Sequence, residues 1–242
     1  MSHPYPHFLI VGFMKAATTS LFDHIVAHPG VQAPMKKELH YFTRELDPLY
    51  DPAFYGLEYH EQLHYDPKSE KLCGEASPSY FVASKRIAAF NPNVKVIIML
   101  RDPVDRALSQ YRQYLEYQLA EYQEHLFDDG IDSLNFVQDS IYEPYVSHFL
   151  HRFPPANVML ISFEHFCAAQ QDAMRHVYRF LGLIPMAIGT DKKLSQTSAK
   201  IAPTVRDRLE SFFSTRRGRI VPLIEHFNPV IYPTNPAAFA IY

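Results

Sequence analysis

The chain is poor in cysteine, in net charge and in long apolar runs. Among its 242 residues the only cysteines are Cys73 and Cys167, too few for a disulfide framework and without metal-ligand spacing. The 13 histidines form no HExxH-type grouping, so no metal is expected. A net charge of −3 argues against a general nucleic-acid binder, which meets phosphates with a basic excess. No apolar run is long enough to span a bilayer and no signal-peptide pattern opens the sequence, so we expect a soluble, cytoplasmic protein.

What is present suffices for one α/β domain. Hydrophobic residues make up 47% of the chain, enough to bury a full core. Apolar and breaker patterns predict strands over 7–11, 71–76, 94–100 and 157–162, and helical segments over 18–27, 84–90, 103–122, 137–153, 164–181 and 204–213. This alternation predicts a P-loop-like, three-layer domain over 1–242, with a mostly parallel central sheet flanked by helices. Residues 31–70 are expected to be irregular with one short helix at most, and 227–242 to form an extended arm.

The first candidate site is the turn between the strand at 7–11 and the helix at 18–27. The first N–H groups of a helix lack intrahelical partners and bind anions. Lys15 adds a positive charge, the short side chains of Ala16 and Ala17 let a ligand approach the backbone, and the helix opens with three hydroxyl donors, Thr18, Thr19 and Ser20. A nucleoside-triphosphate loop is not matched, because it needs Gly directly before the lysine and Ser or Thr directly after it. An ordinary helix start beside a solvated lysine is the alternative.

The second candidate site lies at residues 100–111. Arg101 follows the 94–100 strand, and the carboxyl ends of such strands are where open α/β sheets bind ligands. A guanidinium there can hold a phosphate with two hydrogen bonds. Asp102 and Pro103 are typical of a helix start. Ser109 lies two turns along that helix, on roughly the same face as Asp102 and Asp105 or Arg106, so its hydroxyl could reach the same anion. The alternative is that Arg101 pairs with Asp102 or Asp105 and that Ser109 only packs. Two anion sites on neighbouring strands would suit a nucleotide phosphorylated at both ends.

These two segments, together with three further motifs, resemble the sulfotransferases that use 3′-phosphoadenosine 5′-phosphosulfate (PAPS), and the motifs occur in that family's order. The resemblance is greatest to the branch that modifies glycosaminoglycans and to its bacterial relatives. The further motifs are Lys-Glu-Leu-His-Tyr-Phe at 37–42, Gly-Glu-Ala-Ser-Pro-Ser-Tyr-Phe at 74–81 and Asn-Val-Met-Leu-Ile-Ser-Phe-Glu at 157–164. The resemblance implies that Lys15, Ala16, Ala17, Thr18, Thr19 and Ser20 bind the 5′-phosphosulfate and that Arg101 and Ser109 bind the 3′-phosphate. It also implies that Glu38 is the general base, with His40 as the competing base, and that no metal takes part.

The chain departs from these relatives at some positions. Ala16 and Ala17 stand where many relatives have glycine or serine, and Ala76 stands where the glycosaminoglycan branch has a lysine. The disulfide-bounded loop of that branch is absent. Residues 194–203 stand in its place, with Ser198 and Lys200 as candidate contacts of the 3′-phosphate.

The acceptor is expected to be small or a glycan, and neutral, such as an uncharged carbohydrate or a lipid or polyketide hydroxyl. Residues 44–70 hold two basic against seven acidic side chains, and 113–151 contain no Lys or Arg, so a polyanion would be repelled. Aromatic residues available for stacking are Tyr41, Tyr50, Phe54, Tyr55, Tyr59 and Tyr65. An ordinary solvated acidic face is the alternative.

Two other functions remain to be separated from sulfuryl transfer. A small-metabolite kinase of the P-loop type would require magnesium and a Gly-Lys-[Ser/Thr] loop. A non-catalytic nucleotide-binding protein would fit the departures at Ala16, Ala17 and Ala76. Against it stands the joint retention of Lys15, Glu38, Arg101 and Ser109.

Overall fold

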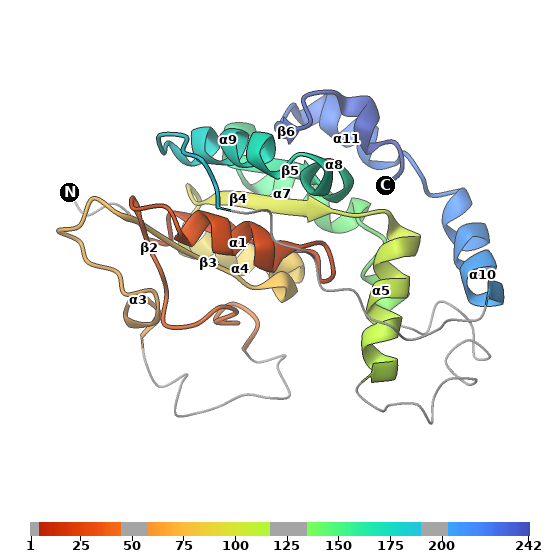
Figure 1. The fold of residues 1–242 in the computed structure, drawn as a ribbon, viewed down its shortest axis with the longest axis horizontal. Coiled ribbons are helices and arrows are strands. Elements are labelled where there is room, and N and C mark those ends of the chain that lie inside the picture. Colours follow the sequence, from red (N-terminus) through yellow and green to blue (C-terminus); the bar gives the residue numbers. More distant parts are fainter. Residues whose placement is uncertain (1–4, 45–57, 117–134, 190–202) are drawn as a thin grey trace.

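One parallel sheet organises the molecule (Figure 1). The computed structural model describes residues 5–44, 58–116, 135–189 and 203–242. Within them the strands lie in the order β2-β3-β1-β4-β5-β6, and every neighbouring pair is parallel. The strands are β1 (Phe8–Ile10), β2 (Val31–Gln32), β3 (Leu72–Ala76), β4 (Lys95–Leu100), β5 (Val158–Ser162) and β6 (Val230–Tyr232). The predicted α/β fold with a parallel central sheet is confirmed.

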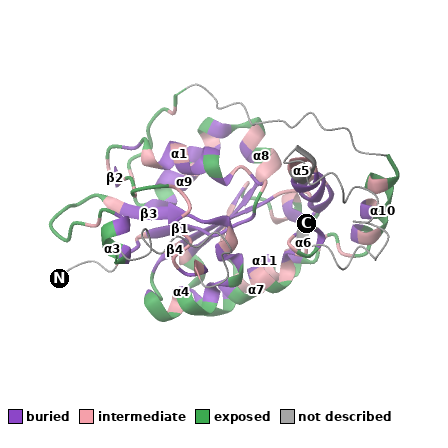
Figure 2. Cartoon of the chain, turned by 90° about the horizontal axis from the view of Figure 1, so that it is seen from below, coloured by how far each residue is buried: buried purple, intermediate pink, exposed green. Residues whose placement is uncertain are grey.

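Helices cover both faces of the sheet. Leu9 and Val96 face one apolar cluster, whereas Phe8, Ile10 and Ile97 face another, as expected of strands buried on both sides. Figure 2 shows α1, α8 and α9 on one side of the sheet and α4, α7 and α11 on the other. The helices are α1 (Thr18–Val26), α3 (Tyr59–Gln62), α4 (Ser84–Phe90), α5 (Pro103–Glu116), α6 (Asn135–Gln138), α7 (Glu143–Arg152), α8 (Phe163–Ala168), α9 (Gln170–Leu181), α10 (Pro203–Ser214) and α11 (Ile220–Phe227), with short 3₁₀ turns η2 (Pro78–Val82), η6 (Pro155–Asn157) and η7 (Pro236–Phe239).

Helices α5 and α10 pack together beyond the carboxyl end of β4 (Figure 1). Helix α5 begins as the sequence predicts. The Asp102 carboxylate accepts hydrogen bonds from the N–H groups of Val104 (2.9 Å) and Asp105 (3.0 Å), and Pro103 occupies the first helical position. The start of α5 thereby fixes the chain directly after Arg101.

Three expectations from the sequence need correction. The helix predicted over 137–153 is two helices, α6 and α7, because Pro144 lacks the N–H that would continue the helical ladder through this point. Residues 31–70 contribute the edge strand β2 as well as the short helix α3. The tail after α11 packs onto the domain as expected, but it is not simply extended: β6 pairs with β5 at the edge of the sheet, and the 3₁₀ turn η7 follows. None of the described helices combines the length and apolar character that a membrane span requires.

Candidate active site

The β1–α1 turn leaves the start of α1 open. Lys15 and Ala17 have left-handed backbone conformations, with φ of 65° and 60°. Ala17 immediately precedes the helix and has no side chain that could cap it. The first N–H groups of α1 therefore lack intrahelical acceptors, and the helix dipole makes this end positive. A helix end of this kind can bind an anion.

The hydroxyls that open α1 differ in their surroundings. Thr19 is exposed, Thr18 is buried, and Ser20 is buried with an Oγ that has no hydrogen-bond partner. An unsatisfied buried hydroxyl costs about 1–3 kcal/mol, so a ligand that bonds to Ser20 Oγ would remove that cost. Ala16 is fully buried, and its N–H donates to the Phe13 carbonyl (3.2 Å), so this residue shapes the turn more than it offers a donor.

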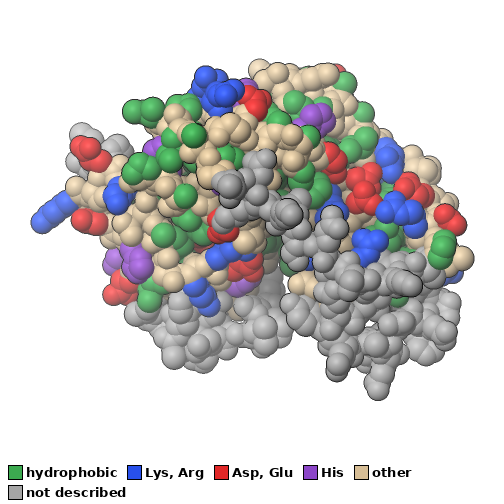
Figure 3. Space-filling model, in the orientation of Figure 1, with side chains coloured by type: hydrophobic (Ala, Val, Ile, Leu, Met, Phe, Trp, Pro, Cys, Tyr) green, Lys and Arg blue, Asp and Glu red, His purple; other side chains and the backbone are tan. Residues whose placement is uncertain are grey.

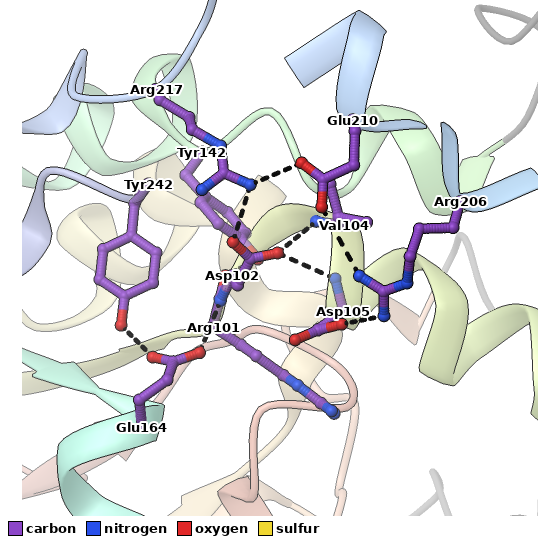
Figure 4. A network of polar contacts seen from close by, with 10 residues as sticks. All are labelled: Arg101, Asp102, Val104, Asp105, Tyr142, Glu164, Arg206, Glu210, Arg217 and Tyr242. Carbon is purple, nitrogen blue, oxygen red and sulfur yellow. Dashed lines mark hydrogen bonds and ion pairs between the residues drawn. The ribbon is translucent and has the colours of Figure 1, made fainter. Parts of the chain in front are cut away.

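Arg101 connects the two candidate anion sites. Strands β1 and β4 are hydrogen-bonded neighbours, which confirms the predicted adjacency. Arg101 Nη1 donates to the Lys15 carbonyl (2.8 Å), and the guanidinium lies over the Phe163 ring, 4.4 Å from its centre. Its Nε is buried without a hydrogen-bond partner. In Figure 4 the guanidinium extends away from Asp102 and Glu164, and no ion pair joins it to a carboxylate drawn there, so a strong donor remains for an anion.

The nearby acids do not neutralise Arg101. Asp102 pairs with Arg217 (3.2 Å) and Asp105 pairs with Arg206 (2.6 Å), and among the described residues no carboxylate forms an ion pair with Arg101. The alternative that Arg101 serves only to pair with these acids is therefore wrong. Ser109 is partly exposed on α5.

Arg106, on the other hand, is a structural residue. Its side chain is fully buried and donates to Ser140 Oγ (2.6 Å) and Gln110 Oε1 (2.8 Å). It therefore ties α5 to the segment that precedes α7.

Three residues that sequence reasoning missed hold the backbone at Arg101 (Figure 4). Glu164 Oε1 accepts from the Asp102 N–H (2.8 Å), and the Tyr142 hydroxyl donates to the Arg101 carbonyl (2.7 Å). The Tyr242 hydroxyl donates to Glu164, and its oxygen lies 2.7 Å from the Ser162 hydroxyl oxygen, within hydrogen-bonding distance. Glu164 ends a motif that could have drawn attention to it, whereas no sequence signal marks the two tyrosines.

Two further arginines, Arg206 and Arg217, form ion pairs with the acidic residues around the start of α5. Arg217 bridges Asp102 and Glu210 (2.9 Å), and Arg206 lies between Asp105 and Glu210. On the face shown in Figure 3, the described Lys and Arg side chains are scattered among acidic ones and do not gather into one basic patch. The site's positive potential is therefore local.

Glu38 and His40 lie side by side on a turn. Both have left-handed backbones, with φ of 63° and 54°. His40 Nε2 lies 3.6 Å from one Glu38 oxygen, and Lys37 pairs with the other oxygen. Burial acts to raise the pKa of Glu38, but hydrogen bonds and charges from His40 and Lys37 outweigh it and lower that pKa to about 2. Glu38 is therefore ionised at neutral pH.

The aromatic residues predicted to stack on an acceptor are only partly available. Tyr59 is 1% exposed and its ring stacks on Tyr41 at 4.2 Å, so Tyr59 belongs to the core and the prediction for it is wrong. Tyr50, Phe54 and Tyr55 lie outside the described residues, as do Ser198 and Lys200. In the described part of the chain, no group of three or more His, Cys, Asp or Glu side chains could hold a metal ion.

The chain thus has an α/β fold with two candidate anion sites at the carboxyl ends of adjacent strands, joined by the hydrogen bond from Arg101 to the Lys15 carbonyl. A model of the sulfotransferase family matches residues 38–186, and the chain belongs to that family. The sulfotransferase from Alicyclobacillus acidocaldarius is 26% identical, with a TM-score of 0.72 over 92% of this chain and 97% of its own. The sulfotransferase domain from the curacin biosynthetic pathway is 15% identical, with a TM-score of 0.52 over 88% of this chain and 99% of its own, and shows the shared fold alone.

The curated relatives are longer than this chain. Human heparan sulfate glucosamine 3-O-sulfotransferase 6 is 30% identical over 211 residues, which are 84% of this chain and 59% of the human protein. Human heparan sulfate glucosamine 3-O-sulfotransferase 3B1 is 29% identical over 215 residues, 85% of this chain and 53% of its own length. The chain thus spans somewhat more than half of these relatives.

Proposed function

We propose that residues 1–242 act as one sulfotransferase domain that moves a sulfuryl group from PAPS to a hydroxyl or amine without a metal. The observation that carries the proposal is the hydrogen bond from Arg101 to the Lys15 carbonyl, which joins two anion sites into one. The unpartnered Ser20 Oγ and Arg101 Nε support it, because they are buried donors whose unsatisfied bonds a ligand with two phosphates would complete. The residues present therefore fit this donor.

Each end of the donor has its own residues in this proposal. Lys15, Thr18, Thr19, Ser20 and the open N–H groups of α1 bind the 5′-phosphosulfate, with Ala16 and Ala17 shaping the turn. Arg101 and Ser109 bind the 3′-phosphate, and Ser198 and Lys200 remain candidates for the same end. In sulfuryl transfer, negative charge builds mainly on the leaving phosphate oxygen. In this proposal, Lys15 and the N–H groups that open α1 stabilise that charge.

Glu38 is the proposed general base, with His40 beside it. A base works best when its pKa lies near the working pH, and the hydrogen bonds and charges of His40 and Lys37 keep the pKa of Glu38 well below that, against the effect of burial. Glu38 can take up the acceptor's proton efficiently only when acceptor binding displaces Lys37 from the carboxylate. His40, bonded through Nδ1 to Ser79 Oγ (2.9 Å), is the alternative base.

Calorimetric titration tests the donor. Adenosine 3′,5′-bisphosphate is expected to bind with sub-millimolar affinity, because both of its phosphates find donors, whereas ATP with magnesium is expected to bind far more weakly. The same measurement with adenosine 5′-phosphate isolates the contribution of the 3′-phosphate. Tight binding of ATP with magnesium and none of the bisphosphate would overturn the proposal in favour of a kinase.

We further propose a neutral acceptor, such as an uncharged carbohydrate or a lipid or polyketide hydroxyl. Within the described residues, 58–70 carry four acidic side chains, Glu58, Glu61, Asp66 and Glu70, against Lys68, and a polyanion would be repelled there. Neutral oligosaccharides are therefore expected to be sulfated faster than heparosan of similar length when radiolabelled sulfate transfer is measured. Equal rates for heparosan and neutral sugars would contradict this prediction.

A further inference from the structure

The turn that carries Glu38 and His40 has an unfavourable backbone. Both residues lie in the left-handed region, which costs free energy for residues other than glycine and persists only where surrounding contacts hold it. The contacts that hold this turn come from the end of β3 and the residues directly after it.

Glu75, near the end of β3, and Ser77, just after it, accept hydrogen bonds from the backbone of this turn. Glu75 Oε2 accepts from the Leu39 N–H (3.0 Å), and Ser77 Oγ accepts from the His40 N–H (3.1 Å). The Ser77 hydroxyl in turn donates to Glu75 Oε2 (2.6 Å). The backbone N–H groups of the two residues that follow Glu38 are therefore both held by one hydrogen-bonded pair.

Glu75 is completely buried, so it cannot touch an acceptor. Its second oxygen, Oε1, accepts from the hydroxyls of Tyr59 (2.7 Å) and Tyr80 (2.7 Å). Burial raises the pKa of Glu75, and its hydroxyl and backbone donors oppose that rise. A buried carboxyl group is tolerated only with such donors, and a fold that needed nothing but packing here would use an apolar side chain.

We propose that the Glu75–Ser77 pair is a positioning device for the catalytic turn: it holds the backbone of Leu39 and His40 so that the side chains of Glu38 and His40 converge. This inference rests on the proposed function. The pair acts through Glu38 and His40 and touches neither donor nor acceptor. Oε2 of Glu75 bonds to the turn, and Oε1 bonds to the tyrosines of the core. Mutations can therefore separate the positioning of the turn from the stability of the core.

Two matched variants test the proposal, because each deletes one hydroxyl that donates to the same carboxylate. Ser77→Ala removes the acceptor of the His40 N–H as well, whereas Tyr59→Phe leaves the turn's contacts in place. Ser77→Ala is expected to lower kcat roughly 10- to 100-fold, since displacement of a reacting group by about 1 Å can cost that much. Its affinity for adenosine 3′,5′-bisphosphate is expected to stay unchanged. Tyr59→Phe is expected to lower the melting temperature comparably and to keep kcat.

The proposal is overturned if Ser77→Ala keeps wild-type kcat, or if both variants lose kcat in step with their melting temperatures. A second readout needs no turnover. The His40 ring resonances in a ¹H–¹³C NMR spectrum are expected to shift in Ser77→Ala and to stay in place in Tyr59→Phe. If no acceptor is sulfated at all, this spectrum still decides the positioning role, while the proposed function fails separately.

Discussion

Replacement of Glu38 by glutamine is expected to lower kcat by ~10²–10⁴, the usual contribution of a general base. Glutamine keeps the size and hydrogen-bonding reach of the side chain but cannot accept the acceptor's proton. Binding of adenosine 3′,5′-bisphosphate should be unaffected, because Glu38 lies on the acceptor side of the proposed site. Steady-state rates at saturating PAPS, together with calorimetry of the bisphosphate, measure the two effects independently.

Lys37→Met is the matched control for this experiment. It leaves the base in place but removes the cation that helps to lower the pKa of Glu38 to about 2. That pKa should therefore rise, and the acidic limb of the kcat/KM profile should move to higher pH, because Glu38 must be deprotonated to act. An unchanged rate in Glu38→Gln combined with an inactive His40→Ala would transfer the role of base to His40.

Removal of the Arg101 side chain is expected to weaken binding of adenosine 3′,5′-bisphosphate by about 1.5–3 kcal/mol, the range for a hydrogen bond to a charged group. This corresponds to roughly a 10- to 150-fold higher Kd. The loss should be smaller for adenosine 5′-phosphate, which lacks the 3′-phosphate. Isothermal titration of both nucleotides against wild-type protein and Arg101→Ala gives the comparison.

Arg206→Ala provides the control, because it removes a guanidinium of the neighbouring network that pairs with Asp105 and Glu210 on the surface. Exposed ion pairs of this kind contribute ~0–1 kcal/mol to stability, so nucleotide affinity should stay near that of the wild type. Equal losses for the two nucleotides in Arg101→Ala would show that Arg101 acts through the Lys15 carbonyl and not through the 3′-phosphate.

The strands that matter most for the site could be predicted because they are buried on both faces. Such strands appear in the sequence as unbroken apolar runs, as at β4 and β5, and the residues that end them are then easy to locate. The edge strands β2 and β6 are only two and three residues long, too short to show any periodicity. The break between α6 and α7 was missed although Pro144 marks it, because the apolar pattern continues across it.

The sequence by itself determined the family, the parallel α/β architecture and the position of Lys15 and Arg101 at the ends of adjacent strands. These follow from local patterns: apolar runs, helix starts and motifs in a fixed order. Only the tertiary structure decided how the site is held together. The hydrogen bond from Arg101 to the Lys15 carbonyl joins residues 86 positions apart. The left-handed turn at Glu38 is held by buried Glu75, which bonds to Leu39, 36 positions away. Such contacts depend on how strands and loops pack in space, and no spacing along the chain encodes them.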